Sequence, residues 1–208
     1  MGIPVLIMGE SGSGKSTSLR NFNPGEIGIF NVASKPLPFR KNLPVANSAG
    51  YQTIVKTLAV HNLKRYAIDD SQYLIAFDFF DKATEKGYDK FTEMALRFYN
   101  LIRFIQQNTP DDCIVYFLHH VEVSYDAVGN RRLKAKTIGK MLDEKLTVEG
   151  LFSIVLLCQS DASGRHYFQT QSNGNSTAKS PMDMFPAEID NDLKAVDTTI
   201  RDYYGLQK

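Results

Sequence analysis

The sequence has little net charge, few cysteines and no long apolar run. Its 24 lysines and arginines are balanced by 23 acidic residues, which leaves a formal net charge of +1 in 208 residues. Such a balance gives the whole protein no strong attraction to polyanions, so a nucleic-acid partner would need a local basic patch. No uninterrupted apolar run approaches the roughly 20 residues that a membrane-spanning helix requires. No internal repeat or low-complexity tract occurs.

The two cysteines, Cys113 and Cys158, both lie in apolar runs, at residues 113–118 and 152–158. We expect them to be buried, reduced thiols of the core, and not a disulfide or a pair of metal ligands. The glycine-rich motif described below begins at Gly9, so no signal peptide is expected before it. These features together predict a cytoplasmic protein without a membrane segment.

Alternating strand and helix patterns predict an α/β protein, in which helices flank a mainly parallel central sheet. Hydrophobic residues make up 43% of the chain, enough for one domain over residues 1–208. The apolar runs predict strands at 3–8, 26–32, 65–68, 113–118, 152–158 and 166–170. Helices are expected at 16–22, 51–62, 72–86, 91–108, 138–145 and 187–204. Residues 121–137 are typical of an inserted β-hairpin, and 171–208 form a C-terminal segment with its helix.

The pattern Gly-x-x-x-x-Gly-Lys-Ser occurs once, between an apolar strand and a helix. Its glycines let successive backbone amides curl around phosphate oxygens, and the helix that follows adds the positive end of its dipole. The lysine would contact the β- and γ-phosphates, and the serine hydroxyl would ligate Mg²⁺. We therefore predict a P-loop that binds ATP and Mg²⁺. The residues expected to hold the nucleotide are Gly9, Glu10, Ser11, Gly12, Ser13, Gly14, Lys15, Ser16 and Thr17.

Two aspartates follow the strand at 65–68. A Mg²⁺-nucleotide needs a carboxylate near the metal, usually at the end of a buried strand. Asp69 is our candidate for that position, together with Ser16. Asp70 would then orient or deprotonate the attacking water. Strands often end in aspartate, so a turn or capping role is the alternative for both residues.

His119 and His120 follow the apolar run at 113–118. The carboxyl edge of a parallel sheet is where ligands bind, so one of these histidines, and more readily His120, would hydrogen-bond the γ-phosphate. The alternative is a pair of satisfied polar side chains at a strand end. Zinc is not expected, because no further histidine or cysteine lies at ligand spacing.

Four segments together resemble the RecA-like ATPases, and specifically the short phage-encoded AAA-domain ATPases of recombination and replication genes. They are residues 9–16, 68–73, 117–120 and 177–181. The group includes phage single-strand annealing recombinases. The resemblance implies that the strand of the two histidines lies between the P-loop strand and the Asp69 strand. It also implies ATP hydrolysis coupled to DNA in a bacterial host, and assembly into rings or filaments.

In RecA-like proteins the loop after the fourth strand contacts single-stranded DNA, and residues 121–140 occupy that place here. The basic residues of this stretch are Arg131, Arg132, Lys134, Lys136 and Lys140. They could neutralise several phosphates and give salt-sensitive binding without sequence preference, while Tyr125 could stack on a base. The alternative is a charged, solvated hairpin without a ligand, since Asp126, Asp143 and Glu144 dilute the positive charge.

RecA-like assemblies often complete the active site with a lysine or arginine of the neighbouring subunit. Lys179, in the polar stretch 171–180, is our candidate for this role as a catalytic residue, and Arg165 is the second. An ordinary surface lysine is the alternative. Unlike full-length recombinases, the chain is short and has no obvious separate DNA-binding domain. An annealing or accessory role, with recruitment by a single-strand-binding protein, is therefore easier to support than strand exchange.

Two other functions fit the same motifs. One is a P-loop kinase that phosphorylates a small nucleotide or a polynucleotide end, with Arg131 and Arg132 in a lid. The other is a non-enzymatic annealing or assembly module in which ATP only orders the fold or the oligomer. In such a module Lys15 would be essential, whereas Asp70 and Lys179 would be dispensable.

Overall fold

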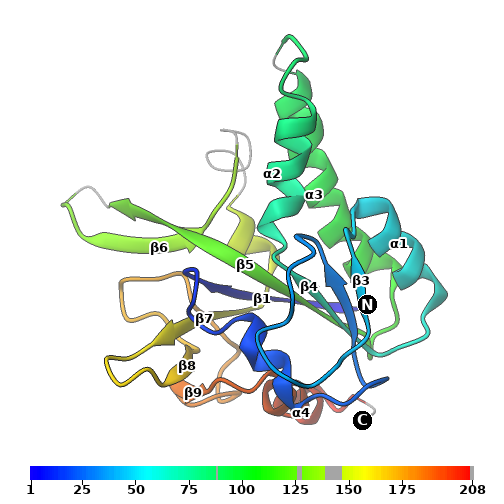
Figure 1. The fold of residues 1–208 in the computed structure, drawn as a ribbon. Helices are drawn as coiled ribbons and strands as arrows, with labels where there is room; N and C mark the ends of the chain where they lie inside the picture. The colour runs from blue at the N-terminus through cyan, green and yellow to red at the C-terminus, as the bar shows by residue number, and fades with distance from the viewer. Residues whose placement is uncertain (88, 126–127, 139–146, 207–208) are drawn as a thin grey trace.

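The computed structural model describes residues 1–87, 89–125, 128–138 and 147–206. Helices cover both faces of a central sheet in these ranges, as the predicted α/β class requires (Figure 1). The strands are β1 Ile3–Gly9, β2 Gly28–Asn31, β3 Val45–Asn47, β4 Arg65–Asp69, β5 Ile114–Tyr125, β6 Arg131–Ala135, β7 Ile154–Ser160, β8 His166–Gln169 and β9 Glu188–Asp190. The helices are η1 Ser16–Asn21, α1 Tyr51–Val60, α2 Gln72–Asp81, α3 Asp89–Asn108, η3 Val148–Leu151 and α4 Leu193–Tyr204.

The strands of the sheet follow the order β3-β2-β4-β5-β1-β7-β8-β9, and β6 pairs with the far part of β5. Neighbouring strands from β3 to β7 are parallel, whereas β8 and β9 are antiparallel additions. The strand of the two histidines therefore lies between the P-loop strand and the Asp69 strand, as expected. Gly9 is opposite His120 in this register, so the carboxyl ends of β1 and β4 lie on either side of the middle of β5, at one edge of the sheet.

Side chains that alternate along the strands divide the core into two layers. On one face, Leu6 and Met8 pack with residues of α1, α2 and α3. On the other face, Val5 and Ile7 pack with residues of η1 and α4. Apolar residues recur at helical spacing from Phe91 to Ile105, as an amphipathic helix requires. On α3 Ala95, Phe98, Leu101, Ile102 and Ile105 are buried and Phe91 is half-buried. None of the described helices has the length and apolar character that crossing a membrane demands.

Strand β5 is longer than the sequence suggested. The strand was expected to end at Leu118, before the two histidines, but it continues to Tyr125 and pairs there with β6 in antiparallel register. Val121 lies opposite Ala135, and Tyr125 lies opposite Arg131, so the predicted hairpin is confirmed. The hairpin projects beyond the sheet on one side, and the α2–α3 pair projects at the top of the view (Figure 1).

The helix after the P-loop and the closing helix differ from their predictions. The helix after the P-loop is a 3₁₀ helix of six residues, so its dipole is weaker than a full α-helix would supply. The closing helix begins at Leu193 and not at residue 187, because β9 intervenes and Asp192 caps the helix by accepting from the amides of Lys194 and Ala195. The helix expected at 138–145 lies outside the described residues except for Ile138. The short strand β3 was not predicted.

Candidate functional site

Residues 9–16 form the loop that leaves β1 and leads into η1. Gly12 and Gly14 have φ angles of 81° and 100°, in the left-handed region that side chains disfavour. A Cβ at Gly14 would lie 2.8 Å from Cγ of His166, and one at Gly9 would lie 2.6 Å from the carbonyl oxygen of Cys158. Both contacts are too close for real atoms. The loop therefore presents bare backbone, which is the surface that a cradle for phosphate oxygens needs.

Lys15 is held inside this loop and is only 6% exposed. Its Nζ donates hydrogen bonds to the carbonyl oxygens of Gly9 and Glu10, both over 2.8 Å. Burial lowers the pKa of Lys15 below its usual range, although the nearby acidic side chains of Asp70 and Asp69 oppose this effect. The ammonium group is thus fixed at the centre of the loop, where an anionic ligand would relieve the cost of its burial.

Ser16 and Asp69 join the P-loop to the end of β4. The hydroxyl of Ser16 donates a hydrogen bond of 2.7 Å to Oδ1 of Asp69. Burial raises the pKa of Asp69, while the hydrogen bond from Ser16 opposes the rise. Among the described residues, no group of three or more histidine, cysteine or acidic side chains could hold a metal. A Mg²⁺ ion that arrives with nucleotide phosphates needs only these two oxygen ligands from the protein, so the pair fits Mg²⁺.

Asp70 has a φ of 58°, a left-handed conformation that is uncommon outside glycine. Its carboxylate contacts two cations or potential cations. Oδ2 lies 2.6 Å from Nζ of Lys35, and Oδ1 lies 3.1 Å from Nε2 of His120. Burial alone would raise the pKa of Asp70, but the hydrogen bonds with His120 and Lys35 outweigh it and lower the pKa. A carboxylate with a lowered pKa is a poor proton acceptor, so Asp70 is better suited to orient water than to deprotonate it.

The two histidines have separate surroundings because adjacent side chains on a strand point to opposite faces. His120 contacts Asp70 and packs edge-on against Tyr73, with 5.8 Å between the ring centroids. His119 is fully buried, and its ring nitrogens lie 2.9 Å from Oγ of Ser71 and 2.8 Å from the carbonyl oxygen of Lys136. Burial lowers the pKa of His119 to about 4. The structure therefore brings His120, but not His119, to the pocket between residues 9–16 and the end of β4, and His119 is a core residue.

A pocket of about 340 Å³ extends from the P-loop to the acidic strand end. Six of the nine predicted nucleotide-binding residues line it, namely Ser11, Gly12, Gly14, Lys15, Ser16 and Thr17. Asp69, Asp70 and His120 line it as well. Of the other three predicted residues, Gly9 and Glu10 hold Lys15 through their carbonyl oxygens, and Ser13 is buried behind the loop.

Lys35 is a pocket residue that was not predicted from the sequence. It follows β2 and lines the pocket beside Pro36 and Pro38. Its Nζ also lies 5.0 Å from the ring centroid of Tyr73, which is a cation–π distance. The only signal in the sequence was its place, since a lysine directly before a proline stands three residues after Val32, the last residue of the strand predicted at 26–32.

The back of the P-loop is supported by two further residues to which no role was assigned. Cys158 donates a weak hydrogen bond of 3.0 Å to the carbonyl oxygen of Ser13, and burial raises the pKa of its thiol to about 11. Asn191 is 2% exposed and donates to the carbonyl oxygen of Gly14 over 3.2 Å. Both cysteines are buried and reduced, as predicted. The thiol of Cys158 therefore supports the loop as a neutral group.

Comparison of the chain with models of known protein families and with curated proteins finds no match. The assignment of a function therefore depends on the chemistry of the pocket and on the resemblance of its motifs.

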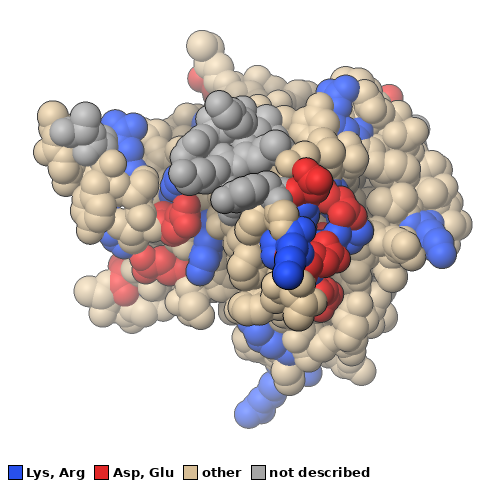
Figure 2. All heavy atoms as spheres, turned by 90° about the horizontal axis from the view of Figure 1, so that it is seen from above, with Lys and Arg blue, Asp and Glu red and all other residues tan. Residues whose placement is uncertain are grey.

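Two of the described basic residues of the hairpin are paired with carboxylates. Nη2 of Arg131 lies 2.8 Å from Oε1 of Glu10 in the P-loop, and Nζ of Lys134 lies 3.1 Å from Oε1 of Glu122 across the hairpin. Arg132 and Lys136 are exposed. Lys140 lies outside the described residues. On the face seen from above, basic and acidic side chains are interspersed, without a large area of one sign (Figure 2).

Neither of the residues expected to act on a neighbouring subunit lies in the pocket of its own chain. The described residues that line the pocket do not include Lys179 or Arg165. The backbone of Lys179 pairs with Val155 through hydrogen bonds of 2.9 and 2.8 Å, which fixes this part of the 171–180 stretch beside β7. Arg165 pairs with Glu188 and stacks over the ring of Tyr167. A role for either residue across a subunit interface stays a prediction.

Proposed function

We propose that this protein binds and hydrolyses ATP with the help of Mg²⁺. The observation that carries the proposal is the hydrogen bond between Ser16 and Asp69 at the mouth of a glycine-rich loop that buries Lys15. This combination provides a backbone cradle, a fixed positive charge and a pair of oxygen ligands within one pocket. A triphosphate with a bound divalent cation needs all three.

In the proposed reaction, water attacks the γ-phosphorus and the bond to the β–γ bridging oxygen breaks, which releases ADP and phosphate. Lys15 and the loop amides hold the phosphates, and Ser16 and Asp69 would hold Mg²⁺. The ion would neutralise charge on the phosphate oxygens. Asp70 orients the water through its carboxylate. His120 is positioned by Asp70 and would report the presence of the γ-phosphate.

We further assign the ATPase to phage DNA recombination or replication, as a homo-oligomeric ring or filament that binds single-stranded DNA in the bacterial cytoplasm. The resemblance of four sequence segments supports this assignment, and so does the order of the central strands, β4-β5-β1. The ion pair between Arg131 and Glu10 gives a physical route for coupling, since it joins the proposed DNA hairpin to the P-loop. A single-strand-binding protein would be a natural recruiting partner.

Steady-state ATP hydrolysis with and without single-stranded DNA, at low and high salt, tests this function. We expect hydrolysis that requires Mg²⁺, is stimulated by DNA at low salt and loses the stimulation at high salt. Lys15→Ala should abolish it, whereas Lys56→Ala, which changes an exposed lysine of α1, should not. Hydrolysis that does not respond to DNA would contradict the DNA-linked role. Equal activity of the Lys15→Ala variant would contradict ATP hydrolysis at this site.

A further inference from the structure

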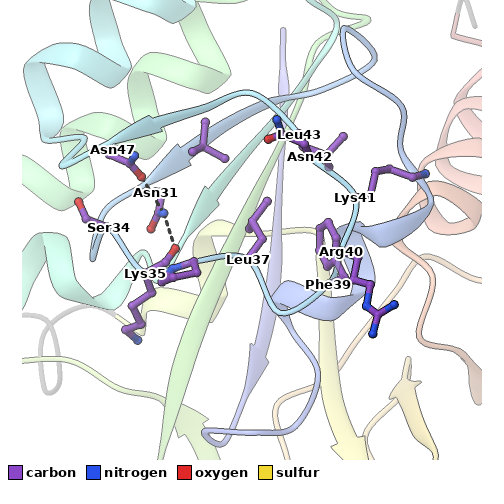
Figure 3. A pocket seen from close by; sticks show the side chains of 12 residues that line it. Asn31, Ser34, Lys35, Leu37, Phe39, Arg40, Lys41, Asn42, Leu43 and Asn47 are labelled. Carbon is purple, nitrogen blue, oxygen red and sulfur yellow. Dashed lines mark hydrogen bonds between the residues drawn. The ribbon is translucent and has the colours of Figure 1, made fainter.

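A second pocket lies beside the nucleotide pocket, between β2, β3 and the chain that connects them (Figure 3). Its volume is about 430 Å³, which is within the range of small-molecule sites. Lys35 and Pro36 line both pockets, so the two are neighbours with a shared wall. None of the functions expected from the sequence uses the segment at 35–43.

Asn31 provides a buried hydrogen-bonding group on the wall of this pocket. Its side chain is 2% exposed, and its Nδ2 donates to the carbonyl oxygen of Lys35 over 2.7 Å and to Oδ1 of Asn47 over 2.9 Å. The acceptor Oδ1 of Asn31 has no hydrogen-bond partner. A buried acceptor without a partner is costly, and a ligand donor would remove the cost. Figure 3 shows Asn31 between Asn47 and Lys35.

The remaining lining combines apolar surface with positive charge. Leu37 and Phe39 are partly buried and offer an aliphatic and an aromatic contact for a flat ring. Lys35 stands at one end of the pocket and Arg40 and Lys41 at the other (Figure 3). The described residues that line the pocket include no carboxylate. A ligand with a flat heterocycle and an anionic group suits such a lining.

The position of the pocket relative to the phosphates narrows its ligand further. Lys35 reaches Asp70, which stands next to the proposed Mg²⁺ ligand Asp69. In the proposed ATP site Ser16 and Asp69 would hold Mg²⁺ beside the terminal phosphates, so the Asp70 side of the pocket would be its γ-phosphate side. The second pocket would therefore lie next to the γ-phosphate of ATP bound at the proposed site, and away from its base.

We propose that this pocket binds a second nucleotide unit, with its base near Asn31 and Asn42 and its phosphate near Arg40. The unit is either a free nucleoside monophosphate or the phosphorylated end of a DNA strand, because both present the same chemistry. Its place beside the γ-phosphate rests on the proposed ATP site, whereas its binding does not require hydrolysis. In this pocket the second nucleotide unit would lie next to the γ-phosphate of ATP. Whether it is a free monophosphate or the end of a DNA strand, it would be the part of that molecule nearest the γ-phosphate.

Isothermal titration calorimetry tests the pocket, with the P-loop site filled by a non-hydrolysable ATP analogue and Mg²⁺. The titrants are the four deoxynucleoside monophosphates, and a ten-nucleotide DNA strand with either a 5′-phosphate or a 5′-hydroxyl. We expect saturable binding of a monophosphate, or of the strand only when it is phosphorylated. Either result supports the pocket and identifies the source of its ligand. No binding of any of these titrants would overturn the proposal.

Two variants assign the binding to this pocket. Arg40→Ala and Asn42→Ala change exposed side chains, so both should fold, and each should weaken the binding by about tenfold. Lys56→Ala should leave it unchanged, and all three should bind the ATP analogue like the wild type. Binding that neither pocket variant weakens would overturn the proposal. In Lys15→Ala the second ligand should still bind although the analogue binds at least about tenfold more weakly, which separates a failure of this pocket from a failure of the ATP site.

Discussion

The hydroxyl of Ser16 lies 2.7 Å from Oδ1 of Asp69, although 53 residues separate them in the chain. The contact forms because β1 and β4 both run parallel to β5, which lies between them, so their carboxyl ends reach the same edge of the sheet. A serine and a carboxylate placed in this way present two oxygen ligands to one point. This arrangement is the basis of the proposed Mg²⁺ site.

Replacing Asp69 by asparagine should stabilise the fold and abolish activity. Burial raises the pKa of Asp69, so the folded protein favours the protonated carboxyl group. At pH 7 the charged carboxylate therefore opposes folding. Stability from this group is present below the unfolded pKa of about 4 and is lost as the pH rises through the folded pKa. Asp69→Asn removes this loss of folding stability. We therefore expect the melting temperature at pH 7 to be about 2–4 °C higher, which is the shift that about 1 kcal/mol of unfolding free energy gives.

The same variant should show at least a hundredfold lower kcat for ATP at saturating Mg²⁺, because it lacks the anionic oxygen for the metal. Thermal unfolding without nucleotide and steady-state hydrolysis check the two effects on one preparation. Asp81→Asn, at the end of α2 and exposed, is the matched control and should change neither quantity. A destabilised Asp69→Asn variant with normal hydrolysis would contradict both the electrostatic account and the metal role.

Acid should destabilise the protein through His119. Burial lowers the pKa of His119 to about 4, below the ordinary value of about 6.5, so the folded state prefers the neutral ring. Stability from this group is present above pH 6.5 and is lost as the pH falls from 6.5 toward 4. Urea unfolding at several pH values should show a decline in this window for the wild type. The decline should be smaller in His119→Gln, and an identical slope in both proteins would count against the buried neutral histidine.

Lys35 should contribute to turnover more than to folding. Its side chain is 56% exposed, so loss of its ion pair with Asp70 costs little stability. Without Lys35, Asp70 loses a partner that fixes its carboxylate, and the γ-phosphate side of the pocket loses a positive charge. We expect Lys35→Ala to lower kcat by about tenfold, with recovery in Lys35→Arg and no change in Lys56→Ala. A normal kcat for Lys35→Ala would show that the lysine only neutralises the carboxylate of Asp70 and does not contribute to turnover.

The Arg131–Glu10 ion pair should couple the hairpin to hydrolysis. Both side chains are more than half exposed, so the charge reversals Arg131→Glu and Glu10→Arg should each change stability by less than about 1 kcal/mol. Each reversal should reduce the stimulation of ATP hydrolysis by single-stranded DNA, and the double variant should restore it. Stimulation that stays low in the double variant would mean that the residues act separately, for example through direct contacts with DNA.

The sequence predicted the parts of the site that depend on local pattern. The spacing of the glycine-rich motif predicted the loop between β1 and the helix after it, and the apolar run at 65–68 predicted Asp69 at a strand end. Lys35 could not be predicted in the same way, because its contact with Asp70 depends on the path of a chain without regular structure. Asn191 was missed for a similar reason, since it approaches the loop from the far end of the chain.

Errors at element ends also had a physical cause. The apolar run in β5 stops at Leu118, but the strand continues because residues 121–125 find backbone partners in β6. His119 therefore lies in the sheet interior, whereas a strand end would have exposed it. The start of α4 could have been predicted more closely, because Asp192 is a capping residue directly before the apolar pattern of Leu193 and Val196.

Binding of a non-hydrolysable ATP analogue, measured by calorimetry with and without Mg²⁺, tests the central claim most directly. The wild type should bind one analogue per chain and bind it more tightly with Mg²⁺. Lys15→Ala should bind at least about tenfold more weakly, because the buried ammonium no longer contacts the phosphates. Undetectable binding to the wild type, or equal affinity in Lys15→Ala, would contradict the assignment of residues 9–16 as an ATP-binding loop.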